Sequence, residues 1–299
     1  MVSCHGTFLS LETHDMANIA FLGTGLLGAA LAEAAAQRGD TVSAWNRTAG
    51  KASALARFGI RAAPTPADAV RGATRVHLVL RDDEVVDEVL ALAQPSLAPD
   101  AVVLDHTTTL PKKTAERATR LTAAGVNYLH CPVFMGPAAA RASQGAMMVS
   151  GPRALFDRVQ PDLSRMTGRL DYLGERPDLA AVNKICGNTL IIGLAGIVAD
   201  VIAQAAERGI DPKTALGFLG KLDANGMIAR RGQNAASNDF TPTFELTMAR
   251  KDVRLMIETA GTRPLAVLSG LAARMDELIK QGHGAKDLAA LSIDSIKAP

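Results

Sequence analysis

A lysine and an asparagine four residues apart are the first residues whose types and spacing suggest chemistry. Lys184 and Asn188 stand near the head of NKICGNTLIIGLAGIVAD, residues 183–200, where nearly every other residue is apolar or small. In a helix this spacing places both side chains on one face. Burial lowers the pKa of an unpaired ammonium, so Lys184 suits a general acid/base whose substrate oxygen Asn188 orients. The alternative is a lysine whose ammonium reaches solvent from the helix end.

A glycine-rich loop follows the first β-rich run of the chain. The stretch IAFLGTGLLGAALAEAAAQRG contains Gly-x-Gly-x-x-Gly between a strand pattern and a helix pattern. The first glycine permits a tight turn, the second lets a pyrophosphate approach the backbone, and the third lets the helix pack closely. A loop used only for packing is the alternative, but the strand–turn–helix context favours dinucleotide binding. The residues expected to face the phosphates are Gly23, Thr24, Gly25, Leu26, Leu27 and Gly28.

The end of the second strand pattern bears on the choice of dinucleotide. An NAD-binding protein usually has an acidic residue here for the ribose 2′-hydroxyl. This sequence reads AWNRTAGK, which places Asn46, Arg47, Thr48 and Lys51 there instead. A guanidinium binds a 2′-phosphate well, whereas a carboxylate repels it. The pattern predicts NADP(H) as the cofactor, and the alternative is that Arg47 is only a solvated loop residue.

Polar clusters mark the ends of later strand patterns, where ligands lie in open parallel sheets. These clusters are RDD at 81–83, DHTTT at 105–109 and CPVFMGP at 131–137. We expect Thr107 to contact the substrate, and Thr108 and Leu80 to contact the cofactor. Capping of the following helix is an equal alternative for the two threonines. Asp105 and His106 are more often structural than catalytic in such a place.

The elements that must position these residues alternate before residue 175 and are all helical afterwards. Strand patterns lie at 18–23, 41–46, 75–80, 101–107, 126–134 and 146–151, and helical patterns between them at 26–38, 51–58, 83–94 and 111–124. Such alternation predicts a doubly wound, mostly parallel Rossmann-type sheet. Further helical patterns lie at 178–208, 212–220, 226–236, 244–261, 264–281 and 285–296. We expect a disordered extension at 1–15, a cofactor domain at 16–176, and an all-α domain for substrate binding and dimerisation at 177–299.

Composition excludes several classes of partner. The 32 basic and 30 acidic side chains are interspersed, with a net charge of +2, so a nucleic-acid surface is not expected. Three widely spaced cysteines favour a reducing, cytoplasmic location, and no ligand pair has zinc-like spacing, so no metal is expected. The first fifteen residues lack the pattern of a signal peptide.

The long apolar run after Lys184 raises the question of a membrane. From Ile185 to Ala199 the run is interrupted by two polar residues and closed by an aspartate. A bilayer span needs about twenty apolar residues, so we expect a buried helix of a soluble protein and no membrane. Its glycines permit close helix packing, and its apolar surface exceeds what one thin helical domain could cover. We therefore predict a homodimer through the C-terminal domains.

Taken together, these motifs resemble the β-hydroxyacid dehydrogenase family, which includes 3-hydroxyisobutyrate dehydrogenases and glyoxylate/succinic semialdehyde reductases. The resemblance covers residues 17–296. GTGLLG matches the family's glycine loop, NRTAGK its NADP-preferring branch, and DHTTTLP its turn for substrate and cofactor. NKICGN matches its Lys-x-x-x-Asn, which implies that Lys184 is the catalytic lysine and Asn188 its partner. ARKDVRL matches its later Lys-Asp motif, which implies that Lys251 faces the cofactor.

The helical pattern around Lys251 predicts a solvent-exposed lysine and not one that faces the cofactor. An apolar stripe predicts the buried face of that helix, and Lys251 lies off it. The two readings agree only if the lysine-bearing face lines the cleft between domains. The stripe consists of Leu246, Ala249, Val253, Met256, Ile257 and Ala260.

The loop after Pro132 and Val133 departs from the family pattern. Where the family has Ser-Gly-Gly to hold a substrate carboxylate, this sequence has Phe134, Met135 and Gly136, followed by a proline that lacks an N–H group. We place these three residues in the substrate site and expect that a larger or more apolar substrate becomes possible. The Gly-x-Gly that precedes the lysine in the family is also absent, replaced by residues 178–180.

The sequence therefore predicts an NADP(H)-dependent oxidoreductase that moves hydride between nicotinamide and a carbonyl or secondary alcohol. The resemblance implies a small, acidic substrate. Reduction of C=N bonds, as in the related imine reductases, is one alternative, although those enzymes typically lack the lysine. A 6-phosphogluconate dehydrogenase would have histidine where Gly187 stands. An NADP(H)-binding sensor without catalytic activity is the alternative from another class.

Overall fold

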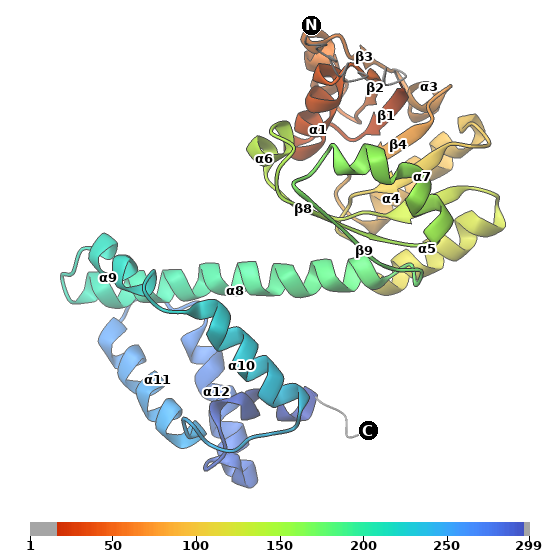
Figure 1. The fold of residues 1–299 in the computed structure, drawn as a ribbon. Helices are drawn as coiled ribbons and strands as arrows, with labels where there is room; N and C mark the ends of the chain where they lie inside the picture. Colours follow the sequence, from red (N-terminus) through yellow and green to blue (C-terminus); the bar gives the residue numbers. More distant parts are fainter. Residues whose placement is uncertain (1–16, 296–299) are drawn as a thin grey trace, which may run out of the picture. The chain divides into compact units, whose positions relative to one another are not determined.

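The computed structural model describes residues 17–295, and the chain divides into two compact units, Met1–Gly187 and Asn188–Pro299. The extension expected at 1–15 lies outside the described residues. The first unit contains a mostly parallel sheet with helices around it, and a long helix leads into a second unit that is helical (Figure 1). The predicted fold class is confirmed.

The sheet has nine strands in the order β3-β2-β1-β4-β5-β6-β8-β7, with β9 beside β8. The strands from β3 to β6 are parallel; β8 runs antiparallel to β6 and β7, and β9 is parallel to β8. Because parallel strands need covered crossovers, this order builds two helical layers. The strands are β1 Asn18–Leu22, β2 Thr41–Trp45, β3 Arg61–Ala62, β4 Arg75–Leu78, β5 Val102–Asp105, β6 Asn127–His130, β7 Val133–Phe134, β8 Ala146–Ser150 and β9 Arg169–Gly174.

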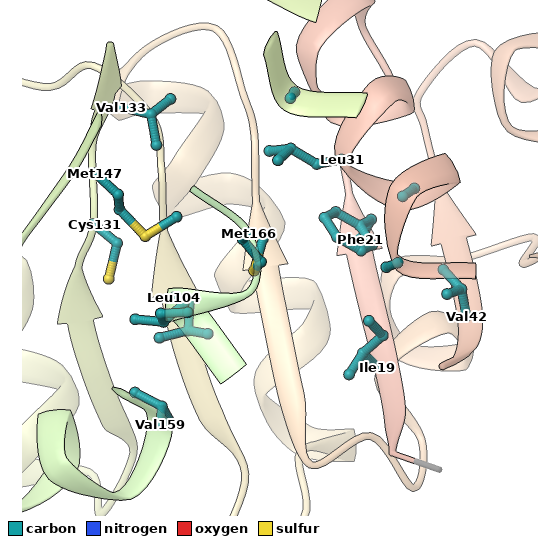
Figure 2. Packing of buried hydrophobic residues seen from close by; sticks show 14 of the residues in the cluster. Ile19, Phe21, Leu31, Val42, Leu104, Cys131, Val133, Met147, Val159 and Met166 are labelled. Carbon is teal, nitrogen blue, oxygen red and sulfur yellow. The ribbon is translucent and has the colours of Figure 1, made fainter. Parts of the chain in front are cut away.

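Strand β1 shows how the sheet separates two apolar cores. Ile19 and Phe21 belong to the core on one face, which Figure 2 shows with residues of α1 and later strands. Ala20 and Leu22, the alternate residues, belong to the core on the other face. The helices of this unit are α1 Leu26–Gln37, α2 Ala49–Ser53, α3 Pro66–Val70, α4 Asp83–Ala93, α5 Pro111–Ala123, α6 Pro137–Arg141 and α7 Arg153–Ser164, with 3₁₀ turns Ala54–Phe58 and Gln94–Ser96.

Several elements of the first unit were not predicted. Strands β3 and β9 and helices α3, α6 and α7 have no counterpart in the expected patterns. Strand β9 is only partly buried along its whole length, so it lacks the apolar run that marks the central strands. Helix α8, Leu179–Glu207, follows the helical pattern expected at 178–208 closely.

The second unit is a set of helices around α11 and α12. Asp200 of α8 accepts hydrogen bonds from the backbone N–H groups of Ala266, Val267 and Leu268 at 2.6–3.0 Å, which satisfies free N–H groups at the start of α12. Gly196 gives Val267 room, because a Cβ there would lie 2.7 Å from its Cγ2. The elements are α9 Pro212–Leu219, α10 Ala224–Ala236, α11 Leu246–Ala260, α12 Leu268–Leu278, a π-helical turn Ile279–His283 and a 3₁₀ helix Leu288–Ser295.

The apolar helix α8 is largely exposed in the single chain, so the prediction of a buried helix is wrong at this level. Only 6% of its most apolar segment is buried, and Ile192 is 69% exposed. The helix has 29 residues and is long and apolar enough to cross a bilayer, judged by length and composition alone. The apolar run from Ile185 to Ala199 is shorter than this helix, so the length of that run does not exclude a membrane span.

Candidate active site

The glycine loop between β1 and α1 has the close packing that its spacing predicts. Gly23 has a φ of 101°, and a Cβ there would lie 2.2 Å from the carbonyl oxygen of Val79. A Cβ on Gly28 would lie 2.1 Å from the carbonyl oxygen of Gly23. A Cβ on Gly25, in contrast, would meet nothing within 4 Å. The first and third glycines thus pack the turn, and the second leaves its backbone open to a ligand.

The start of α1 is suited to an anion. Gly25 is its N-cap and has no side chain to accept from the first N–H groups, and no acidic residue lies in the first turn. The N–H of Thr24 donates to Asn46 Oδ1 at 3.0 Å, which joins the loop to the end of β2. The hydroxyl of Thr24 is buried and has no partner among the described residues. An uncapped helix start and an unpartnered buried hydroxyl fit the pyrophosphate of a dinucleotide.

A hollow of about 320 Å³ opens beside this loop. Predicted cofactor residues make up much of its wall: Gly23, Gly25, Asn46, Arg47, Thr48, Lys51 and Leu80. Two further charged residues, Arg81 and Glu88, also line it and were not assigned from the sequence. Neither Arg47 nor Lys51 forms an ion pair with any residue between 17 and 295, and both are exposed. The wall therefore offers two free cations at the end of β2.

The turn after β5 places one predicted threonine inside and one outside. Thr107 is buried, its N–H donates to Asp105 Oδ1 at 3.0 Å, and its hydroxyl oxygen accepts from the N–H of Leu80 at 3.1 Å. Thr108 is exposed. Helix α5 begins after Leu110 without a side-chain cap. The capping alternative is therefore wrong, and Thr107 instead joins the ends of β4 and β5.

A fully buried arginine, Arg117, lies beside the turn after β5. Arg117 of α5 lies 2.9 Å from Asp83 Oδ1, 2.7 Å from Asp87 Oδ1 and 3.9 Å from Asp105 Oδ2. Tyr128 donates its hydroxyl proton to Asp105 at 2.8 Å. Burial works to raise the pKa of Asp105, but the neighbouring His130 ring, the N–H of Thr107 and Arg117 outweigh burial, and the pKa is lowered. The carboxylate of Asp105 is thus held ionised beneath Thr107.

Arg117 was not assigned from the sequence, although a signal was present. The buried positions of α5 are Thr114, Arg117, Ala118 and Leu121, which is helical spacing. An arginine within such a stripe needs acidic partners, because a buried charge without one is very costly. Aspartates in the preceding helix pattern were available as partners.

Two histidines near this turn have a structural role, in agreement with the sequence expectation for His106. His106 Nδ1 lies 2.7 Å from the carbonyl oxygen of Cys131, which can only accept, so Nδ1 carries the proton. His77 Nδ1 then donates to His106 Nε2 at 2.9 Å. Burial lowers the pKa of both rings, so the pair is neutral. In the described range, 17–295, no cluster of His, Cys, Asp and Glu could hold a metal.

The first turns of α8 bring Lys184 to Phe134, the last residue of β7. Buried Ser150 accepts from the N–H of Ala180 at 3.1 Å and donates to the carbonyl oxygen of Pro177 at 2.8 Å, which ties the start of α8 to β8. Lys184 Nζ lies 3.9 Å from the centre of the Phe134 ring. Burial lowers the pKa of Lys184, and no ion pair joins it to a residue in the described part of the chain.

The remaining predicted residues have less distinctive surroundings. Asn188 lies one turn beyond Lys184 on α8 and is half-buried. Met135 is partly buried against the core, and Gly136 is exposed at the start of α6. Lys251, on α11 in the second unit, is exposed and pairs with Asp252 at 2.9 Å. Its role toward the cofactor stays a prediction.

The stripe around Lys251 is confirmed in part. Leu246, Ala249, Val253 and Ala260 are buried, and Ile257 packs against their core. Met256 is exposed, so its assignment to the buried face is wrong.

Comparison with known proteins adds to this geometry. Residues 18–174 match the family model for the NAD binding domain of 6-phosphogluconate dehydrogenase, and residues 180–292 match that for NAD-binding of NADP-dependent 3-hydroxyisobutyrate dehydrogenase. The chain belongs to the β-hydroxyacid dehydrogenase family. It is an NAD(P)-dependent oxidoreductase.

Individual relatives extend over nearly the whole chain. A 3-hydroxyisobutyrate dehydrogenase of Pseudomonas aeruginosa is 27% identical, over 87% of this chain and 90% of its own. An NADPH-dependent reductive aminase of Aspergillus oryzae is 25% identical, over 92% and 95%. The solved structure of an imine reductase from Myxococcus stipitatus in complex with NADP+ has a TM-score of 0.84 at 23% identity, over 92% and 99%. At this identity the structural match indicates the fold alone.

Proposed function

We propose that the protein is an NADP(H)-dependent oxidoreductase that interconverts the carbonyl group of an aldehyde or ketone and the corresponding alcohol. A bound nicotinamide supplies or accepts the hydride. Gly23, Gly25 and the start of α1 would hold the pyrophosphate, with Thr24, Leu26, Leu27 and Gly28 completing the loop. The adenosine end of the cofactor would be held by Asn46, Arg47, Thr48 and Lys51. The rest of the cofactor would be held by Leu80, Thr108 and Lys251.

The observation that carries the proposal is the state of Lys184. Its ammonium has no carboxylate partner among residues 17–295, and burial lowers its pKa. A group in this state gives up a proton readily to a developing alkoxide and takes one from an alcohol in the reverse direction. Asn188, on the same face of α8, would orient the reacting oxygen, and Thr107 would contact the substrate beside it.

The same lysine bears on the choice between C=O and C=N chemistry. A protonated imine carries positive charge, and an ammonium next to it would raise the energy of the complex. A carbonyl oxygen, which becomes negative during reduction, is stabilised by that ammonium. Reductive aminases and imine reductases among the similar proteins make C=N reduction the second candidate.

A substrate panel decides between these candidates. With NADPH in excess, we expect loss of absorbance with aldehydes or ketones and at least tenfold lower kcat/KM with cyclic imines. Faster turnover of imines would assign C=N reduction. Tight NADPH binding without turnover of any compound in a broad panel would favour the sensor.

Arg47 is proposed to select NADP(H). Replacement of Arg47 by Asp is expected to raise the Kd of NADPH by about 10- to 100-fold, because a charge-assisted hydrogen bond is lost and a repulsive charge is gained. The Kd of NADH should change little. Isothermal titration with both cofactors measures this difference, and Arg57→Ala, an exposed arginine outside the hollow, is the matched control. An equal loss for both cofactors would contradict the role of Arg47.

The exposed apolar surface of the second unit supports the predicted homodimer. Ile191 and Ile192 of α8 are 54% and 69% exposed, and Phe218 of α9 is 63% exposed. Side chains of this size are rarely left in water as a group. We expect light scattering coupled to size exclusion to give twice the chain mass, and Ile192→Arg to shift the protein toward monomer. A monomeric wild-type protein would contradict the dimer.

The free cysteines Cys131 and Cys186 support a reducing, cytoplasmic location.

A further inference from the structure

Phe134 lies between the proposed catalytic lysine and a glycine of the same helix. The ring centre of Phe134 is 3.9 Å from Lys184 Nζ, within the distance at which an ammonium is attracted to a ring face. A Cβ built on Gly187 would lie 2.3 Å from Cζ of the same ring and 3.0 Å from Cε1. Any side chain at 187 would therefore collide with the ring. Gly187 provides the space, and Phe134 occupies it.

The ring changes what the site offers to a ligand. Because an aromatic face attracts the ammonium without neutralising it, Lys184 keeps a partner although no carboxylate pairs with it in the described part of the chain. The side of the ammonium turned to the ring is closed to an anion. An oxygen of a ligand can then approach Lys184 Nζ only from the side turned away from the ring.

The residues that follow Phe134 offer no hydroxyl or cationic side chain to a second anion. Met135 brings a thioether and packs against the core. Pro137 has no N–H group, so the start of α6, a helix of only five residues, lacks its first donor. A carboxylate needs hydroxyl, amide or cationic donors to replace its hydration, whereas an apolar group is stabilised by burial against such a loop.

From this arrangement we propose that Phe134 is the specificity-determining residue of the site, and that the substrate carries an uncharged apolar group, not a carboxylate, beside the reacting carbonyl. This inference rests on the proposed carbonyl chemistry and replaces the acidic substrate that the family resemblance implies. Phe134 acts in two ways: its ring holds the Lys184 ammonium, and it presents an apolar surface to the substrate.

Two aldehydes of nearly equal shape test the preference. 4-Methylpentanal ends in an isopropyl group, and 4-oxobutanoate ends in a carboxylate at the same position. We expect the wild-type enzyme with NADPH to prefer 4-methylpentanal by at least tenfold in kcat/KM. Phe134→Ser should reduce that ratio at least tenfold, with the Kd of NADPH unchanged. A wild-type preference for 4-oxobutanoate, or an unchanged ratio in Phe134→Ser, would overturn the proposal.

A binding measurement separates this proposal from the proposed function. 4-Methylpentan-1-ol and 4-hydroxybutanoate cannot react with the reduced cofactor, so their affinity for the NADPH complex is measurable by cofactor fluorescence even if no aldehyde is turned over. Tighter binding of the neutral alcohol, lost in Phe134→Ser, supports the specificity role. Equal or tighter binding of 4-hydroxybutanoate overturns it. Absence of turnover alone would count against the carbonyl chemistry and not against the apolar subsite.

The contact with Lys184 has a readout that needs no cofactor. The pH dependence of Lys184 labelling by an amine-reactive reagent, followed by mass spectrometry, reports its pKa in the free protein. Phe134→Leu keeps the site apolar but removes the ring, so the pKa should fall by about half a unit. An unchanged pKa would show that the Phe134 ring does not stabilise the Lys184 ammonium.

Gly187 supplies a second, independent variant. Gly187→Ala should displace the ring and lower kcat/KM for 4-methylpentanal at least tenfold, and Phe134→Ala in the same chain should restore part of that loss. Gly232→Ala, in exposed α10 where a Cβ meets nothing within 4 Å, is the matched control and should leave kcat/KM unchanged. Additive effects of the two substitutions would contradict the contact.

Discussion

Replacement of Lys184 by Ala is expected to lower kcat about a thousandfold while NADPH binds as before. The side chain is the only group near Phe134 that we expect to move a proton, and its loss leaves the developing alkoxide without a donor. In the proposed function the dinucleotide is bound by the glycine loop and residues 46–51, which line the hollow and which the substitution does not touch. Steady-state kinetics and cofactor titration on the same preparation separate the two effects.

The control for this variant is another lysine beside a phenylalanine. Lys286 Nζ lies 5.7 Å from the centre of the Phe240 ring in the second unit. Lys286→Ala removes a similar ammonium from a similar neighbour and should leave kcat unchanged. A kcat of Lys184→Ala within threefold of wild type would sink the assignment of the general acid.

The pH profile gives an independent check. A general acid must be protonated for carbonyl reduction, so the rate should fall as the pH rises through the pKa of Lys184. Because burial lowers that pKa from the ordinary lysine value, the fall should begin at a lower pH than for an ordinary lysine. The profile of Lys184→Ala should lack this limb, whereas that of Lys286→Ala should keep it.

Replacement of Arg117 by Met is expected to destabilise the first unit by about 3–5 kcal/mol at pH 7, because it leaves buried carboxylates without their cation. Asp83 and Asp105 are both buried, and Asp105 is fully so. Urea unfolding followed by fluorescence of Trp45, the only tryptophan in the sequence, reports on this unit. Arg120→Met is the matched control, since Arg120 is exposed and shares Asp87 with Arg117; its cost should be below about 1 kcal/mol.

The difference between Arg117→Met and wild type should shrink on acidification. In the wild type the pKa values of Asp87 and Asp105 are lowered, since their hydrogen bonds and charges outweigh burial, which alone would raise them. A lowered carboxyl pKa stabilises the fold above the unfolded pKa, about 3.9, and this contribution is lost as the pH falls through the folded value. A gap that stays constant as the pH falls from about 5 to about 2 would show that the charges of the network are not responsible.

The same variant tests whether the network positions Thr107. Asp105 receives the N–H of Thr107 and faces Arg117, so loosening the turn should raise KM for the carbonyl substrate more than it raises the Kd of NADPH. A purely structural role would lower the amount of folded protein without changing the KM of the folded fraction.

Local signals made the glycine loop and the central strands predictable. The spacing of Gly23, Gly25 and Gly28 is set by contacts within one turn, and the packing at 23 and 28 follows from it. Strands β1, β4, β5 and β6 are buried and apolar enough to be read from a short window. Strand β9 was missed because a partly buried strand carries a weaker pattern. Helix α7 was missed although Phe156, Val159 and Leu163 are buried at helical spacing, and it contains Pro161, a residue that normally interrupts a helix.

The exposed surface of α8 shows what the hydrophobic pattern of a helix cannot predict. Its residues are apolar on all sides, which is typical of a core helix, yet the single chain leaves most of them exposed. Hydropathy records that a surface must be covered and says nothing about which part of which chain covers it. For this reason we tie the apolar surface to association of two copies, and the test is the oligomeric state.

The amino-acid sequence by itself determined the fold class, the cofactor loop and the family, because each depends on residues close together in the chain. Tertiary structure alone decided which distant side chains meet. Arg117 is buried among carboxylates from other elements, and Phe134 stands between Lys184 and Gly187. The charge and shape of this candidate site depend on these contacts between side chains. The hydrophobic spacing along one helix or strand does not specify such contacts, because the partner lies on another element.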